Sequence, residues 1–504
     1  MELQLFFFVI PFFLLFLFHF LSKYFNPKTN KLPPGPKKFP LIGNLHQLAM
    51  SKKLPHHALQ ELSQKYGPLM HLQLGEISTV IVSSPKLAKE VMKTHDVVFA
   101  NRPKLLAPEI MVYGSKDIVF SPYGDFWRQM RKICVLELLS AKRVQSFSYI
   151  REDESTKLIQ SIQSTANSTI NLTSRIFAMV SNAISRAAFG EKSKDQQEFV
   201  ELVKKVVEIS SGLDVDDMFP SIKPLHILTG MRSKLDKFHK RVDTIIGNIV
   251  RQHQEKRSKG KEDNNNVEVD KEDLVDVLLR VQESGDLDVE ITTNNIKAVI
   301  WDVFVAGTDT TATTIEWTMS ELMKNPSARK KVQAELRAAL KGKETIQESD
   351  LQELSYLKLI IKETLRLHPP SPLLVPRESS ELTIIDGYEI PKNTKVIINA
   401  WALARHPDYW TDAEMFIPER FEDSSVDFKG NNFEFIPFGA GRRMCPGMSF
   451  GLASVTLPLA KLLYHFDWEL PDAMKHEDLD MNEHFGMAVG RESELCLIPS
   501  VCVM

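Results

Sequence analysis

The stretch Pro437-Phe438-Gly439-Ala440-Gly441-Arg442-Arg443-Met444-Cys445-Pro446-Gly447 sets one cysteine in a glycine-rich, doubly basic turn that opens an apolar helix. Its glycines let the backbone approach a partner closely or take a positive φ, and Pro446 suits the first position of the helix. Cys445 is therefore expected at a helix N-terminus, where the helix dipole and the two adjoining arginines favour thiolate over thiol. This sulfur is predicted to be a nucleophile or a metal ligand.

Several common roles for such a cysteine do not fit. A phosphatase loop needs an arginine six residues later, where this chain has Gly451. A zinc site needs a second nearby ligand, but no other cysteine lies close in sequence, and a dinucleotide loop needs a third glycine in place. What remains is a single thiolate ligand to a cofactor that supplies the other ligands itself, which describes haem. A buried inert cysteine is the simpler alternative, yet it explains neither the arginines nor the glycines.

The stretch resembles the cysteine signature of the cytochromes P450, F-x-x-G-x-R-x-C-x-G, and its full wording is similar to that of plant microsomal members. The resemblance implies a mainly α fold with small β-sheets. It also implies that heme b (iron protoporphyrin IX, called haem below) is bound, with Cys445 as the ligand of the iron. The signature positions expected around this cofactor are Phe438, Gly439, Arg443 and Gly447.

Composition narrows the class of protein. The chain has 504 residues, of which 43% are apolar and 25% charged, as in globular proteins. Its net charge of −3 argues against a broad basic field and so against nucleic acid as a partner. Four cysteines are too few for a disulfide framework and indicate a reducing compartment.

The N-terminus is predicted to be a membrane anchor over residues 1–24. Leu3 to Leu21 is almost wholly apolar and just long enough to span a bilayer. Glu2 replaces the basic residues of a cleaved signal peptide, and no small-residue cleavage site follows. Lysines directly after the segment keep the C-terminal side in the cytoplasm. We expect a single-pass protein with a stiff proline-rich hinge (25–40) and a cytosolic catalytic domain (41–504), and the resemblance implies the endoplasmic reticulum membrane.

Local patterns predict several elements. Alternating β-branched residues predict a hairpin over 69–82 that turns at Gly75, and 105–119 reads as an irregular stretch that covers the substrate in the family. Helical patterns run over 149–188, 195–211 and 232–255, and the polar run 255–272 is expected to be a mobile surface linker.

Asp125 can cap a helix that begins at Phe126 and carries Trp127 and Arg131 one turn apart. Without further motifs, the simplest interpretation of this pair is a tryptophan buried in the core and an arginine whose charged end reaches solvent. The W-x-x-x-R pattern of the family implies that both side chains bind a haem propionate, because the guanidinium fork suits a carboxylate. The resemblance places Arg377 on the second propionate.

The longest helix is expected to start after Thr292 or Thr293 and to end at Asn325-Pro326. Its apolar pattern is interrupted at Ala306-Gly307-Thr308-Asp309-Thr310-Thr311, where glycine and threonine disfavour a regular helix. Close helix packing is one explanation. The match to the family motif A/G-G-x-D/E-T-T implies oxygen activation, with Ala306 beside a gap for dioxygen, Thr310 as a catalytic residue and Asp309 as a proton relay.

Two further patterns resemble family motifs. Glu363 and Arg366 match E-x-x-R, which joins the arginine of P-E-R-F, Arg420, in a buried structural network. Leu374, Val375 and the segment 485–489 match substrate-lining positions, and their apolar character suggests a lipophilic substrate.

Together the motifs imply a haem-thiolate monooxygenase that oxidises a lipophilic plant specialised metabolite with O2. No flavin or nicotinamide signature is present, so electrons are expected from a separate NADPH-cytochrome P450 reductase. A terpenoid or triterpenoid is the first substrate class and a flavonoid the second, since similar scaffolds act on both. A non-oxygenating reaction (desaturation, rearrangement or ring coupling) and a non-catalytic haem sensor are the alternatives.

Overall fold

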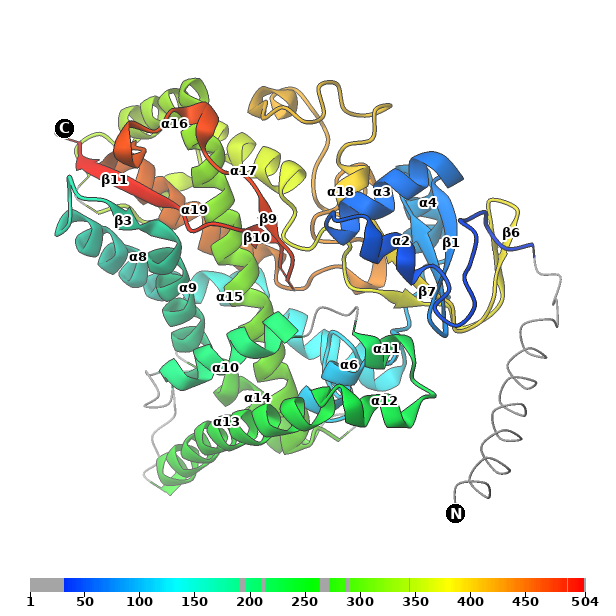
Figure 1. The fold of residues 1–504 in the computed structure, drawn as a ribbon. Helices are drawn as coiled ribbons and strands as arrows, with labels where there is room; N and C mark the ends of the chain where they lie inside the picture. The colour runs from blue at the N-terminus through cyan, green and yellow to red at the C-terminus, as the bar shows by residue number, and fades with distance from the viewer. Residues whose placement is uncertain are drawn as a thin grey trace, which may run out of the picture.

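Helix α15 (Thr293–Lys324) runs through the middle of the helical part of the protein (Figure 1). In this computed structural model the described residues are 31–190, 196–209, 214–262, 272–285, 290–343, 345–486 and 488–502. The Thr292 side chain accepts the backbone N–H of Asn295, and the Asn295 side chain accepts the backbone N–H of Thr292. The helix ends before Pro326, so both predicted limits are confirmed.

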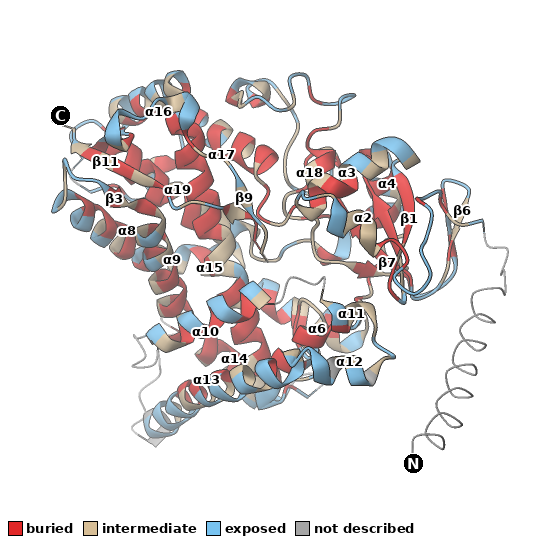
Figure 2. Cartoon of the chain, in the orientation of Figure 1, coloured by how far each residue is buried: buried red, intermediate tan, exposed pale blue. Residues whose placement is uncertain are grey.

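The main helical layer packs around α15. Helices α9 (Leu172–Phe189) and α19 (Met448–His465) lie along it, and α8 (Ser148–Gln163) packs against both. Much of α9, α15 and α19 consists of buried residues, which are coloured red in Figure 2. The other long helices are α10 (Gln196–Ile209), α13 (Met231–Glu262), α14 (Leu274–Ser284), α16 (Pro326–Ala339) and α17 (Ser355–Leu367).

A four-stranded sheet lies to one side of the helices, in the order β1-β2-β7-β4 (Figure 1). Strands β1 (Leu69–Leu74) and β2 (Ile77–Val82) form the predicted hairpin, with Gly75 at a positive φ of 61° in the turn. Strand β7 (Lys395–Ile398) pairs in parallel with β2 and antiparallel with β4 (Arg377–Glu378). The sheet therefore brings Arg377 beside segments far from it in sequence.

Shorter elements complete the fold. Three small sheets are formed by β3 (Ile170–Asn171), β11 (Cys496–Val501) and β8 (Phe466–Glu469), by β5 (Thr383–Ile385) and β6 (Tyr388–Ile390), and by β9 (Glu483–His484) and β10 (Gly490–Arg491). The short helices are α2 (Leu45–Met50), α3 (Pro55–Tyr66), α4 (Pro85–Lys89), α5 (Leu106–Met111), α6 (Asp125–Ile133), α7 (Ala141–Ser146), α11 (Val215–Met218), α12 (Lys223–Leu228) and α18 (Ala400–Leu403).

The structure corrects four local predictions. The stretch 105–119 contains helix α5, and 149–188 is two helices separated by β3. Helix α6 begins at Asp125 itself, and no side chain caps it. Helix α13 continues into the predicted linker as far as Glu262, while residues 263–271 lie outside the described residues. The mainly α fold with small sheets is confirmed.

The predicted anchor (1–24) lies outside the described residues, as does part of the hinge (25–40). Within the described ranges, no helix combines the length and apolar character needed to cross a bilayer. The described part of the hinge lies against β1, where the carbonyl of Pro34 accepts the N–H of His71 at 2.8 Å. A Cβ on Gly35 would lie 2.1 Å from the His71 carbonyl oxygen, so only glycine permits this approach.

Candidate functional site

A cavity of about 490 Å³ lies between α15, the Cys445 stretch and the segment that leads into β4. Ten of the eleven predicted site residues line it, and Trp127 is the exception. Most of the other lining side chains are apolar, and they come from the α5 region, from 373–376 and from Phe485. The cysteine signature, the interrupted stretch of the longest helix and the predicted substrate-lining segments therefore meet around one cavity, although Met487 of the predicted 485–489 segment lies outside the described residues.

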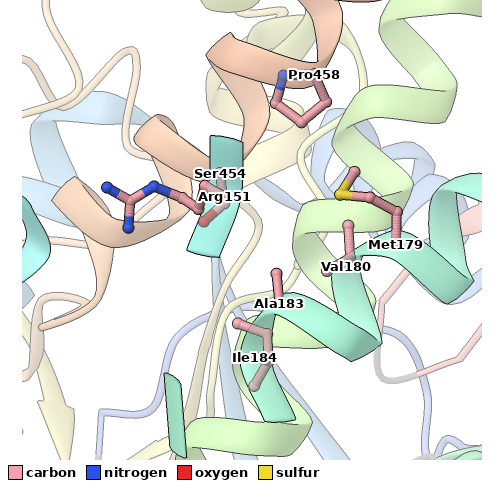
Figure 3. A pocket seen from close by; sticks show the side chains of 7 residues that line it. All are labelled: Arg151, Met179, Val180, Ala183, Ile184, Ser454 and Pro458. Atoms are coloured by element: carbon pink, nitrogen blue, oxygen red, sulfur yellow. The ribbon is translucent and has the colours of Figure 1, made fainter. Parts of the chain in front are cut away.

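A second cavity, shown in Figure 3, is much smaller, at about 10 Å³. It lies between α8, α9 and α19, and its polar lining consists of Arg151 and Ser454. This volume has room for about one water molecule, so the cavity is not a substrate site.

Backbone hydrogen bonds fix the loop that carries Cys445. The N–H of Cys445 donates to the Phe438 carbonyl at 2.9 Å, and the N–H of Met444 donates to the Gly441 carbonyl at 3.0 Å. Gly439 and Gly441 have positive φ values of 72° and 68°. A Cβ on Gly441 would lie 2.2 Å from the Met92 carbonyl oxygen, so this position requires glycine.

The surroundings of the Cys445 sulfur differ from the prediction. Helix α19 begins at Met448, so Pro446 is not its first residue. Arg442 instead lies near Asp96, with its Nε 3.6 Å from a carboxylate oxygen of that residue, and Arg443 binds backbone carbonyls. Burial raises the pKa of the Cys445 thiol, and the backbone N–H of Gly447 and the charge of Arg131 act in the opposite direction.

Four arginines line the cavity close to one another: Arg102, Arg131, Arg377 and Arg443. Arg377 donates to the Ala440 carbonyl at 2.8 Å and lies 3.3 Å from a carboxylate oxygen of Asp96. Arg131 donates to the Met444 carbonyl. Burial, followed by the charge of Arg377, lowers the pKa of Arg443 to about 9. The cluster therefore carries more positive charge than its protein partners neutralise.

Arg102 was not predicted as a site residue. Its Nη1 donates to the carbonyls of Val375 and Pro376, both at 2.7 Å, and its Nε donates to the Val119 carbonyl at 2.9 Å. It follows Asn101 in a segment without periodicity, so no sequence pattern marks it. A buried arginine of this kind is found only from the tertiary contacts.

Trp127 lies behind the arginines and away from the cavity wall. Its indole N–H donates to the Ile118 carbonyl at 3.0 Å. The Arg443 guanidinium lies 4.2 Å from the centre of its ring system, and that of Arg131 lies 5.5 Å away. In this conformation Trp127 supports the arginines instead of facing the cavity.

The centre of α15 is open to the cavity at Ala306, which is exposed although it lies midway along the central helix. The hydroxyl of Thr310 donates to the Ala306 carbonyl at 2.6 Å. A Cβ on Gly307 would lie 3.0 Å from Ile184 on α9, so this glycine permits close packing of the two helices. Burial raises the pKa of Asp309, while the backbone N–H of Ala488 opposes the shift by donating to its carboxylate.

The predicted E-x-x-R network is confirmed. Arg366 donates from two nitrogens to the two carboxylate oxygens of Glu363, both at 2.8 Å, and Arg420 donates to Glu363 at 3.0 Å. Glu363 and Arg366 are fully buried. The remaining Arg366 donors reach the carbonyls of Ala404, Ala413 and Met415. The network joins α17 to the segment that precedes the Cys445 loop.

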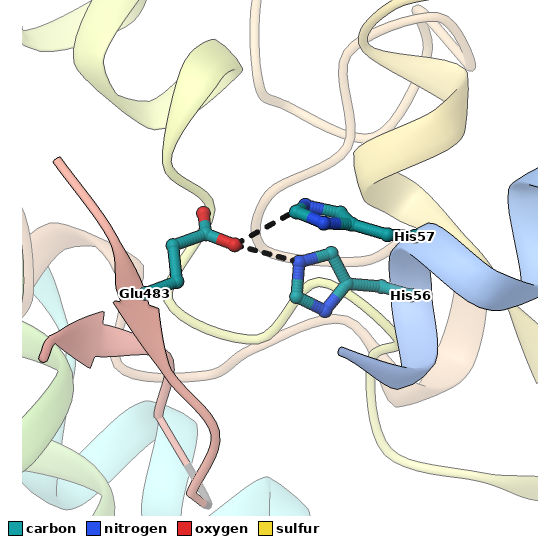
Figure 4. A group of neighbouring side chains, drawn as sticks. All are labelled: His56, His57 and Glu483. Atoms are coloured by element: carbon teal, nitrogen blue, oxygen red, sulfur yellow. Dashed lines mark hydrogen bonds and ion pairs between the residues drawn. The ribbon is translucent and has the colours of Figure 1, made fainter. Parts of the chain in front are cut away.

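A group of side chains outside the cavity, His56, His57 and Glu483, has the composition of a metal site (Figure 4). One oxygen of Glu483 lies 2.9 Å from His56 Nε2 and 3.3 Å from His57 Nε2. Hydrogen bonds account for these contacts. The positive charge of Arg405 nearby opposes protonation of His56 and would oppose a metal ion as well. We interpret the group as a charged link between α3 and β9.

Residues 33–494 match the family described as cytochrome P450. The chain belongs to the cytochrome P450 family. It is 64% identical over 494 residues to cytochrome P450 71D8 of Glycine max, with 98% of both chains covered. It is 55% identical over 496 residues to premnaspirodiene oxygenase of Hyoscyamus muticus, again with 98% of both chains covered.

Solved cytochrome P450 structures share the fold. A zebra fish cytochrome P450 solved with progesterone aligns with a TM-score of 0.76 at 26% identity, covering 89% of this chain and 100% of that one. Cytochromes P450 are haem-iron monooxygenases, so this chain is a haem enzyme of that class.

The cavity of this cytochrome P450 fits the haem. A haem carries two propionate carboxylates, and the four arginines of the cluster outnumber the acidic neighbours described for them, Asp96 and Asp117. Besides desolvation, the charges of Arg443 and Arg377 lower the pKa of Arg102, and the charge of Asp117 opposes them only in part. At another part of the cavity wall, the Cys445 side chain lies inside the protein but is accessible from the cavity, beside glycines at 439 and 447, which leave room for a flat group.

Proposed function

We propose that this cytochrome P450 hydroxylates a terpenoid, using O2 and electrons that a separate NADPH-cytochrome P450 reductase delivers. The observation that carries the proposal is the shared cavity, which has Cys445 and the arginines on its wall together with Ala306, Asp309 and Thr310 of α15. A flavonoid is the second substrate class. The membrane topology is part of the proposal: residues 1–24 anchor the protein in the endoplasmic reticulum membrane, 25–40 form the hinge and 41–504 face the cytosol.

The residues of the Cys445 loop and the arginine cluster would hold the haem. Cys445 would ligate the iron as thiolate, because a metal ion deprotonates a coordinating thiol and so overcomes the effect of burial. Arg131, Arg377 and Arg443 would pair with the propionates, with Trp127 as support or as a direct donor after exchange of its bond to Ile118. Phe438, Gly439 and Gly447 would line the face of the ring beside the sulfur. The bound haem supplies oxygen activation and insertion into a C–H bond.

Asp309 and Thr310 would take up and donate protons at the α15 wall of the cavity. The Thr310 hydroxyl donates to the Ala306 carbonyl and keeps its own lone pairs free to accept a hydrogen bond. The raised pKa of Asp309 brings its carboxyl closer to the pH at which it can both take and give a proton. Ala488 holds this carboxyl in place through its backbone N–H. The small side chain of Ala306 leaves space for dioxygen.

The apolar lining supports a terpenoid. Side chains such as Met111, Val303, Leu374, Val375 and Phe485 present hydrocarbon surface, which suits a ligand with few polar groups. Relatives named germacrene A hydroxylase, from Barnadesia spinosa and Saussurea costus, are 52% and 51% identical to this chain. Another relative, from Nicotiana tabacum, is named 5-epiaristolochene 1,3-dihydroxylase and is 54% identical. Their names point to hydroxylation of terpenoid hydrocarbons.

The test is reconstitution of the membrane-bound protein with reductase, NADPH and a panel of terpenoid hydrocarbons and flavonoids under isotopically labelled O2. We expect the wild-type enzyme to place one labelled oxygen atom in a terpenoid product, and we expect the Cys445→Ser variant to form no labelled product. A flavonoid product would contradict the proposed terpenoid substrate, and a product without label would contradict the proposed insertion of oxygen from O2. The carbon monoxide difference spectrum of the reduced protein should show the red-shifted Soret band of thiolate ligation, and Cys445→Ser should lose it.

A further inference from the structure

Two buried carboxyls meet at the wall of the cavity. Asp117 lies in the segment before α6 and is 0% exposed, and Asp302 lies on α15 and is 6% exposed. Asp302 also lines the cavity, one helical turn before Ala306. In the described part of the chain, the hydrogen bonds that reach these carboxyls come from backbone N–H groups and not from cationic side chains. Two acids in such a place need another source of stabilisation, because an unpaired buried charge is costly.

Backbone donors satisfy one oxygen of each carboxyl. Asp117 Oδ2 accepts the N–H of Phe120 at 2.9 Å and that of Val119 at 3.3 Å. Asp302 Oδ2 accepts the N–H of Ile118 at 3.0 Å, which ties the same short segment to α15. Asp117 Oδ1 is buried and receives no backbone or amide donor from the described part of the chain. Because Asp302 accepts the N–H of Ile118, the residue that directly follows Asp117, the two carboxyls are neighbours, and a hydrogen bond between two carboxyls requires a proton on one of them.

The surrounding charges show which acid keeps the proton. Burial raises the pKa of Asp117, but backbone N–H donors oppose this shift, and Asp117 faces the guanidinium groups of Arg102 and Arg443, which favour its anion. Asp302 faces the buried thiol of Cys134 and the carboxyl of Asp117, and neither group favours its anion. Burial, and then the charge of Asp117, raise the pKa of Asp302 well above its ordinary value. The arrangement is therefore a protonated Asp302 that donates to an ionised Asp117.

The segment held in this way forms part of the active-site wall. Ile118, Val119 and Phe120 all line the cavity. The Ile118 carbonyl accepts from Trp127, and the Val119 carbonyl accepts from Arg102. One part of the segment thus contacts Trp127 and Arg102, which lie beside the arginines assigned to the propionates, and Asp302 fastens Ile118 to α15.

We propose that the carboxyl pair Asp117–Asp302 is a proton-dependent fastener that fixes residues 117–120 against α15 and thereby determines which carbon of the substrate is oxidised. The inference rests on the proposed monooxygenase function for its effect on products. The pair acts through Ile118, Val119 and Phe120, so both acids are positioning residues. Loss of the shared proton leaves two adjacent anions, which repel each other and release the segment.

Three variants separate the shared proton from mere packing. Asp302→Asn keeps the fastener without a titrating proton, because its amide donates to Asp117 and its carbonyl oxygen accepts from Ile118. Asp302→Ala removes the fastener and leaves Asp117 unpaired. Asp117→Asn keeps a hydrogen bond between the two positions, because the amide at 117 can donate to an ionised Asp302. This variant provides a second test if Asp302→Ala does not fold.

The first readout is amide hydrogen exchange of 117–121 in the haem-loaded protein without substrate. We expect wild type, Asp302→Asn and Asp117→Asn to be equally protected at neutral pH, and Asp302→Ala to exchange about tenfold faster because a buried hydrogen bond is lost. Alkaline pH accelerates amide exchange in every protein, and Asp302→Asn measures this ordinary acceleration. Wild type should show a larger increase in exchange rate than Asp302→Asn, because the shared proton is lost. The proposal would be overturned if Asp302→Ala exchanged its 117–121 amides at the same rate as Asp302→Asn. It would also be overturned if Asp302→Ala exchanged them at the same rate as wild type.

The second readout is the ratio of oxidation products from a terpenoid. Asp302→Ala should change the ratio at neutral pH, whereas Asp302→Asn should keep the wild-type ratio at all pH values. Unchanged products in Asp302→Ala would refute the role in site selection. If no terpenoid is oxidised by wild type, the proposed function fails, and hydrogen exchange still decides whether the fastener exists.

Discussion

Arg443 stacks on Trp127, with the guanidinium carbon 4.2 Å from the centre of the indole ring system. The same guanidinium donates to the carbonyls of Ala100, Ile118 and Ser121. One side chain of the cysteine signature thus organises two segments that precede α6 and the first residues of α6 itself. The arginine has a structural task in addition to its proposed contact with a propionate.

Replacing Arg443 with lysine should weaken haem retention, although the charge is kept. A lysine cannot reproduce the planar fork that binds several carbonyls and stacks on an indole. We expect a loss of about 2 to 3 kcal/mol of stability, the sum of a few hydrogen bonds, and a lower haem-to-protein ratio after purification. Arg442→Lys is the matched control, since Arg442 is exposed. Equal haem content in both variants would contradict the structural role.

Gly441→Ala should disrupt the Cys445 loop. A methyl group there combines strain at φ 68° with a 2.2 Å approach to the Met92 carbonyl oxygen. Gly285→Ala is the control, because Gly285 has the same φ of 68° but no described atom within 4 Å of an added Cβ. The control should lose only the strain cost of about 1 to 2 kcal/mol. We expect the thiolate-type carbon monoxide spectrum to vanish in Gly441→Ala and to persist in Gly285→Ala.

Glu363→Gln should destabilise the protein by about 3 to 5 kcal/mol, because it leaves two arginines beside a neutral amide in a buried network. Thermal unfolding followed by circular dichroism and by haem absorbance measures this loss. The control is Asp386→Asn, which removes an exposed ion pair with Lys86 and should leave both curves unchanged. Similar small shifts in the two variants would show that the network adds little stability.

Thr310→Ala should lower product formation about tenfold or more while NADPH consumption continues, because the hydroxyl that is assigned to proton handling is lost. Thr310→Ser keeps a hydroxyl and should retain most of the product yield. The ratio of product to NADPH consumed is the measurement. A Thr310→Ala enzyme with the wild-type ratio would remove Thr310 from the catalytic residues.

His71 should make stability depend on pH. Burial, and then the charge of Lys38, lower its pKa from 6.5 to about 4. In the unfolded chain His71 is therefore protonated as the pH falls through 6.5, whereas in the folded chain it stays neutral until about pH 4. The resulting stability is present above pH 6.5 and is lost as pH falls toward 4, with a span of about 3 kcal/mol.

The change His71→Gln tests this dependence, because glutamine can replace the contact between His71 Nε2 and the Ser78 hydroxyl, at 2.9 Å, without titrating. Unfolding by denaturant at several pH values should show a flatter profile for the variant. Parallel profiles for the two proteins would assign the pH dependence to other groups.

The elements that the sequence predicted well are those whose signals are local. The cap at Thr292 and the hairpin turn at Gly75 depend on a few neighbouring residues, and both were confirmed. Helix α5 was missed because Pro108 was taken as a sign of irregular backbone. Pro108 lies in the first turn of α5, where its missing N–H is not needed.

The parts of the site that escaped prediction are products of tertiary packing. Arg102, Asp117 and Asp302 carry no motif, and they meet only because three distant segments pack together. The guanidinium of Arg443 turns away from the neighbouring sulfur because backbone carbonyls nearby need donors. Neither outcome follows from spacing along the chain, because the competing partners belong to other segments.

The attachment of Pro34 to β1 has a mechanical consequence. The Pro34 carbonyl is bonded to the N–H of His71 and Gly35 closely approaches the same strand, so the chain is fixed to the sheet at residues 34 and 35. Strand β1 forms one edge of a sheet whose other edge, β4, carries Arg377. A force applied at residues 34 and 35 is therefore transmitted through the hydrogen-bonded sheet to the strand that carries Arg377 at the cavity wall.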